Sequence, residues 1–86
     1  MQNADDGGWP SGLSLEKARR TLALTSTDLY ARYVGVTGLA SMAEVDAHLL
    51  DIGESLPACE HDKLVLALNE CFLEQHLPDR LPFHQP

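Results

Sequence analysis

The stretch from Glu60 to Leu77, EHDKLVLALNECFLEQHL, most constrains the fold, because it contains no glycine or proline and has a helical apolar period along its length. Placing its residues about 100° apart gathers one broad apolar stripe, formed by Leu64, Leu68, Cys71, Phe72 and Gln75, with Val65 and Ala67 at its edges. Such a stripe predicts a helix that is buried against a core. Pro57 precedes or opens its first turn, and Pro78 stops it.

The same helix has a second apolar face, because Leu66, Leu73 and Leu77 fall roughly opposite the stripe. Charged residues flank these leucines, among them Glu70 and Glu74. Two interpretations stay open. The helix is central, with neighbours on both sides, or the three leucines form an exposed seam that binds a partner or a second copy of the chain. Burying each leucine is worth about 1.5–3 kcal/mol, so this face matters under both interpretations.

Three shorter helices are predicted upstream from apolar residues spaced three and four apart. They cover Leu15 to about Leu24, Asp28 to about Val36, and Met42 to about Ile52. Their buried faces are expected to contain Leu15, Ala18 and Leu22, then Leu29, Tyr33 and Val36, then Met42, Val45, Leu49 and Ile52.

Polar residues are expected to begin these helices, and glycines are expected to end them. Ser14 is the expected cap of the first helix, and Ser26 or Thr27 that of the second. The pattern Ser41-x-x-Glu44 is a capping box that begins the third. Gly38 and Gly53 are expected to end the second and third helices.

No stretch alternates like a strand, and no internal repeat is present. The sequence therefore predicts an all-α fold, a compact bundle of about four short helices with a long C-terminal central helix and flexible termini. Eighty-six residues make one domain. We expect a disordered arm over residues 1–12, the helical domain over 13–77, and a Pro-rich tail over 78–86 that packs back through Leu81 and Phe83.

The net charge of the chain argues against some classes of function. Six basic and thirteen acidic residues give a net charge of −7, which argues against broad affinity for nucleic acid or anionic lipid. It favours a basic partner or simple solubility, and the run Glu44, Asp46, Asp51 and Glu54 is either a solvated face or a mimic of nucleic acid toward such a partner. No apolar run reaches about 18 residues, and the N-terminus lacks the apolar core of a signal peptide. We expect a cytoplasmic protein without a membrane segment.

No motif for a metal, a cofactor or catalysis stands out. Cys59 and Cys71 would be about 18 Å apart on a continuous helix, which is beyond the reach of a disulfide. Cys71 is expected in the core as a small apolar residue, and Cys59 is expected nearer the surface. The potential metal ligands lack a Cys-x-x-Cys or His-Glu-x-x-His spacing, and they are Cys59, His48, His61, His76 and His84. The histidines are expected at surface or helix-end sites. The pairs His61–Asp62 and Cys59–His61 have no supporting catalytic motif, so no enzyme activity is predicted.

The stretch LSLEKARRTLALTSTDLYARYV resembles the opening of MerR-type and excisionase-type DNA-binding domains, in the order of Leu15, Ala18, Leu22, Leu24 and Leu29. The resemblance implies a helix-turn-helix over residues 15–36. DNA contacts would then come from Arg19, Arg20, Thr27, Tyr30 and Arg32. Ala23 occupies the position of the usual turn glycine, and Asp28 lies in the would-be recognition helix.

The stretch GLASMAEVDAHL, residues 38–49, looks like the motif of acyl and peptidyl carrier proteins. The resemblance implies a phosphopantetheine arm on Ser41, with Met42 and Val45 fitting the pattern. The aspartate that precedes the serine in that family is Ala40 here. The simpler interpretation of Ser41 is a helix cap.

The sequence thus favours a small acidic regulatory or adaptor module that binds another protein. Its expected binding face is Leu66, Leu73 and Leu77, with Glu70 and Glu74 as an acidic rim that suits a basic partner. A second copy of the chain is also a candidate partner. The DNA-binding regulator and the Ser41 carrier are the alternatives.

Overall fold

The computed structural model describes residues 12–83. These residues form four helices and no strand: α1 (Leu13–Thr21), α2 (Ser26–Gly35), α3 (Met42–Leu49) and α4 (Ala58–Glu74). The predicted all-α bundle with a long C-terminal helix is confirmed. Apart from Gly12, the predicted arm over residues 1–12 lies outside the described residues, as do residues 84–86 of the tail.

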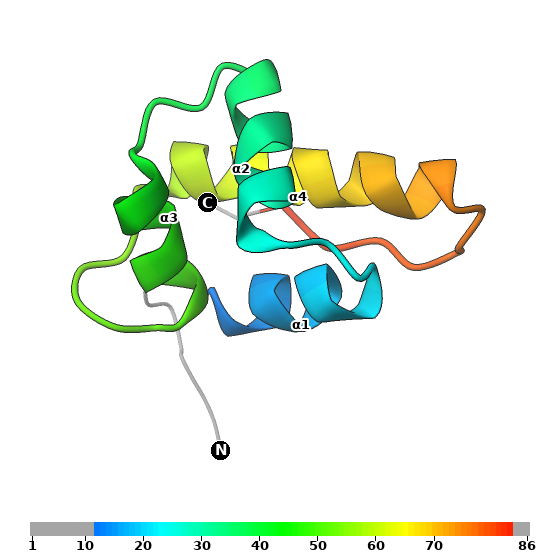
Figure 1. Cartoon of the computed structure of the whole chain (residues 1–86), viewed down its shortest axis with the longest axis horizontal. Coiled ribbons are helices and arrows are strands. Elements are labelled where there is room, and N and C mark those ends of the chain that lie inside the picture. Colours follow the sequence, from blue (N-terminus) through cyan, green and yellow to red (C-terminus); the bar gives the residue numbers. More distant parts are fainter. Residues whose placement is uncertain (1–11, 84–86) are drawn as a thin grey trace.

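Helix α4 is the element around which the others are arranged (Figure 1). Helices α1 and α4 both run along the long axis, α2 crosses α4, and α3 closes one end of the molecule. After α4 the chain turns back along it, where the side-chain amide of Asn69 donates to the Leu81 carbonyl at 3.0 Å and accepts from the Leu81 N–H at 2.7 Å. Leu81 thereby packs against the core, as predicted, whereas Phe83 is 47% exposed.

The core is built from the faces that the helical period predicts. In α4 the buried apolar residues are Leu64, Val65, Ala67, Leu68, Cys71 and Phe72, and they meet Leu15, Ala18, Leu22, Leu29, Tyr33, Val45 and Leu49 from the other helices. Four predicted core positions are not buried, and two of them, Val36 and Met42, are half-buried. Gln75 is exposed and its amide donates to the Leu22 carbonyl, while Ile52 is 59% exposed because α3 ends before it.

The helix starts follow cap chemistry. The Ser41 capping box is confirmed, with the Ser41 hydroxyl accepting from the Glu44 N–H at 3.2 Å and the Glu44 carboxylate from the Ser41 N–H at 2.8 Å. A second capping box joins Thr25 to Asp28, one residue before the predicted cap of α2. The prediction for Ser14 is wrong, because α1 begins earlier with Gly12 as its N-cap and Ser14 lies inside the helix. Helix α4 begins after Pro57, as expected.

The helix ends depart from prediction for one shared reason. Ala23, Thr37, Asp51 and His76 have positive φ values of 58°, 67°, 59° and 59°. After each of them, the next N–H donates to a carbonyl five residues back, as Leu24 does to Arg19 and Leu77 to Phe72. This is the Schellman geometry, in which a left-handed residue satisfies the last carbonyls of a helix. All four helices therefore end before the predicted residues, and α4 ends well before Pro78.

Gly38 has a different role from the predicted helix stop. A side-chain carbon at this position would lie 2.3 Å from the Tyr33 ring. Gly38 therefore lets the chain pass close against that ring, and Tyr33 is fully buried as a result.

Candidate protein-binding surface

The apolar face predicted on α4 is partly exposed. Leu66 is 39% exposed and Leu73 is 63% exposed, so the second side of α4 lacks a covering helix at these two residues. Cys59 is also exposed and lies one more seven-residue step toward the start of the helix. We call Leu66 and Leu73 the α4 face.

Leu77 separates from the other two leucines because α4 ends before it. Its N–H donates to the Phe72 carbonyl at 2.9 Å in the Schellman turn, and its side chain packs against the core. Helical geometry no longer applies beyond Glu74, so a three-leucine seam on one helix does not form.

The acidic residues beside the α4 face differ in their partners. Glu70 is exposed. Glu74 accepts a two-pronged pair from Arg32 of α2, at 2.9 and 3.0 Å. The hydrogen bond from Arg32 lowers the pKa of Glu74 below its usual value. Glu70 is thus the carboxylate with more freedom to meet a partner's cation.

The arginines expected at a DNA interface pair with carboxylates. Arg19 donates to Glu16 at 2.7 and 2.8 Å and to the Leu24 carbonyl at 2.6 Å, which holds the turn between α1 and α2. Arg20 pairs with the same Glu16 at 3.0 Å, and Arg32 pairs with Glu74.

The other two residues of that set do not share one surface role. Thr27 is exposed in the first turn of α2, whereas Tyr30 is half-buried and its hydroxyl donates to the Ala40 carbonyl at 3.1 Å. Ser41 is exposed and acts as the cap of α3. DNA binding and modification of Ser41 both stay predictions.

A buried polar network was not foreseen. Glu60, 7% exposed, accepts from the Tyr33 hydroxyl at 2.5 Å, from the Leu39 N–H at 2.9 Å and from the Lys63 ammonium at 2.9 Å. The Tyr33 hydroxyl in turn accepts from the Ala40 N–H at 2.8 Å. These bonds fasten the loop between α2 and α3 to the first turn of α4. They lower the pKa of Glu60 to about 2, with the Leu39 N–H as the largest cause.

Two buried histidines correct the expectation of surface sites. His48 and His61 are 2% and 6% exposed, and His48 Nε2 lies 3.0 Å from His61 Nδ1. His48 Nδ1 accepts from the Leu56 N–H at 3.1 Å, so His48 carries its proton on Nε2 and donates it to His61. Zinc–nitrogen bonds of about 2.0 Å on both sides would need a wider gap than this direct contact.

The sequence positions of Glu60, His61 and His48 indicate that these residues are buried. Glu60 and His61 lie four residues before Leu64 and Val65, on the buried stripe extended by one turn, and His48 follows Val45 by three. Within residues 12–83, no group of three or more His, Cys, Asp or Glu residues could hold a metal ion.

Comparison with protein-family models, curated proteins and solved structures gave no match. Over the described part of the chain, none of the helices combines the length and the apolar character that crossing a bilayer requires.

Proposed function

We propose that this chain is a small cytoplasmic adaptor or regulatory module that binds another protein through the α4 face. The observation that carries the proposal is the exposure of Leu66 and Leu73 on the helix whose other side forms the core. Apolar side chains that recur on one helix face are the usual anchors of helix-mediated recognition. Two unbridged cysteines, Cys59 and Cys71, fit a reducing compartment.

Charge supports a basic partner. Glu70 is exposed beside Leu66 and Leu73 on α4, and the chain carries a net charge of −7. A cationic partner would gain attraction during approach and at the rim of the contact. A second copy would bring the same negative charge to this face, so another protein is favoured over a homodimer.

The first test replaces Leu73 with aspartate. We expect Leu73→Asp to abolish capture of a partner while helicity stays close to that of the unchanged chain, because Leu73 is mostly in solvent. A photoreactive benzophenone on Cys59 would record the contact, since this thiol lies on the same side of α4. Capture from source-cell extract is compared between the two chains by mass spectrometry, and helicity is measured by circular dichroism.

The matched control is Ile52→Asp, which adds the same charge at an exposed apolar residue outside α4. Capture should survive in this variant. Unfolding of Leu73→Asp would show that the face is part of the core. If Leu73→Asp and Ile52→Asp capture the same amount of partner, the α4 face has no binding role.

A further inference from the structure

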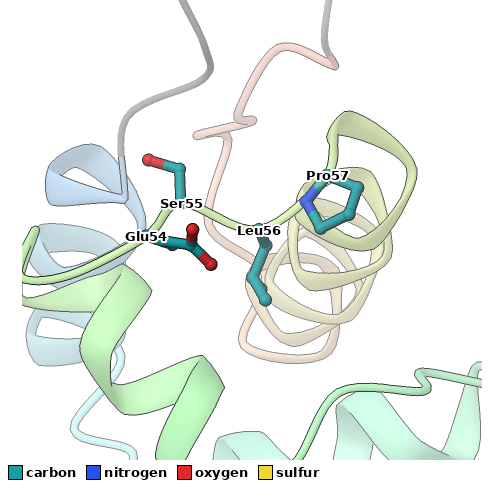
Figure 2. A pocket seen from close by; sticks show the side chains of 4 residues that line it. All are labelled: Glu54, Ser55, Leu56 and Pro57. Carbon is teal, nitrogen blue, oxygen red and sulfur yellow. The ribbon is translucent and has the colours of Figure 1, made fainter.

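We propose a second recognition site: the groove between α3 and residues 54–57 binds an apolar side chain of a protein partner, with basic residues of that partner on either side. This site is separate from the α4 face and has its own chemistry. Figure 2 shows the loop that forms one wall.

The groove consists of two adjoining cavities of about 400 and 500 Å³ that share Glu54, Ser55, Leu56 and Pro57. The larger cavity also contacts α3 at Ala43, Glu44 and Ala47. Ala43 and Ala47 are four residues apart, so they lie on one face of the helix. Their small side chains leave open the space that a larger residue would fill. Cavities of this size suit the side chains of a short peptide.

The loop wall is held in place before any partner arrives. The Leu56 N–H donates to buried His48, and the Leu56 side chain is only 5% exposed. Pro57 follows directly as the N-cap of α4 and fixes the backbone there. In Figure 2, Ser55 points away from the side on which Leu56 lies. A wall that is already ordered spares a partner the cost of ordering it.

The charge of the groove selects the partner. Among residues 12–83, the charged residues that line the two cavities are Glu44 and Glu54, and both are exposed. One oxygen of Glu44 accepts from the Ser41 N–H, which leaves its second oxygen for another donor. No lysine or arginine of the described chain lines either cavity. A partner with arginine or lysine beside an apolar residue therefore complements the groove, and a second copy of this acidic chain does not.

Nuclear magnetic resonance on the ¹⁵N-labelled full chain tests this proposal with three blocked tripeptides. The probe is arginyl-leucyl-arginine, and the controls are glutamyl-leucyl-glutamate and arginyl-glycyl-arginine. We expect saturable amide shifts at Ala43, Ala47, Ser55 and Leu56 with the probe at millimolar concentration. Each control should bind at least about threefold more weakly, because it lacks either the charge or the apolar anchor.

Matched variants assign the site. Glu54→Gln should weaken binding of the probe about twofold to fivefold, the range of one exposed ion pair. Glu70→Gln removes the same charge from α4 and should leave the affinity for the probe unchanged. Ala47→Leu fills the groove and should block the shifts. A melting temperature near that of the unchanged chain would show that this variant still folds, and Glu54→Gln keeps the test independent of it.

Several outcomes would overturn the proposal. These are no groove shifts at about 5 mM probe, equal shifts with all three peptides, or equal losses in Glu54→Gln and Glu70→Gln. Groove shifts that depend on protein concentration alone would assign the groove to a second copy instead. Leu73→Asp should bind the probe normally, so failure of the α4 face and failure of the groove can be told apart.

Discussion

At the scale of single residues, the four left-handed helix ends are the least expected feature. A non-glycine residue in this conformation costs roughly 1–2 kcal/mol compared with glycine, and Ala23, Thr37, Asp51 and His76 all adopt it. The sequence predicts that the second and third helices end at Gly38 and Gly53, because glycine is the usual residue at a helix end. The left-handed residue at each of the four helix ends is not a glycine, so the positions of glycine in the sequence could not reveal where the helices end.

Ala23 offers a direct test of this cost. Ala23→Gly should raise the free energy of unfolding by about 0.5–1 kcal/mol, because relief of the left-handed strain exceeds the added flexibility of the unfolded chain. Urea unfolding followed by circular dichroism measures it. The same substitution at Ala31, exposed inside α2, should lower the free energy of unfolding by about 1 kcal/mol. A loss of stability in both variants would mean that Ala23 is not strained.

At the scale of elements, α4 is predictable as far as Glu74, because an apolar period needs only local information, whereas its end is not. The same argument gave the buried faces of α1 and α2. It could not give the link between the α2–α3 loop and Glu60, since those partners are 21 to 27 residues apart. A buried carboxylate is tolerated only where tertiary structure supplies its donors, and tertiary structure is not encoded in a local pattern.

Glu60 should make this link sensitive to acid. Its pKa falls from 4.5 to about 2 on folding, so the stabilisation is present above pH 4.5 and is lost as the pH falls toward 2. The loss should be on the order of 2 kcal/mol in the free energy of unfolding. Urea midpoints measured from pH 7 down to pH 3 should decline less in Glu60→Gln than in the unchanged chain. Glu70→Gln, at an exposed position, should decline as the unchanged chain does.

At the scale of the whole molecule, the bundle was foreseen but its groove was not. The groove exists because the loop after α3 places residues 54–57 beside that helix, around a space that Ala43 and Ala47 leave open. Both alanines look unremarkable in a helical period. The α4 face, by contrast, was visible in the spacing of Leu66 and Leu73, and only its exposure had to come from the structure.

His48 should add a second pH dependence, at milder acidity, to the stability of the molecule. Burial lowers its pKa below the usual 6.5, while nearby Asp51 opposes the shift. The unfolded chain therefore takes up a proton first as the pH falls below 6.5, which favours unfolding. The urea midpoint should drop between pH 7 and pH 5, and His48→Gln should remove much of this drop. In His76→Asn, altered at an exposed helix end, the drop should persist. An unchanged drop in His48→Gln would place its origin elsewhere.

The two hydrogen bonds between Asn69 and Leu81 determine which substitutions the segment after α4 can tolerate. Asn69 holds the returning segment through main-chain atoms, so the path of that segment depends little on the side chains that neighbouring residues carry. Substitutions at the exposed residues Asp79 and Pro82 should therefore have little effect on the fold. A substitution at Asn69 would remove both hydrogen bonds to Leu81 and would leave only apolar packing against the core to hold this segment, so Asn69 is the position of α4 at which the returning segment tolerates change least.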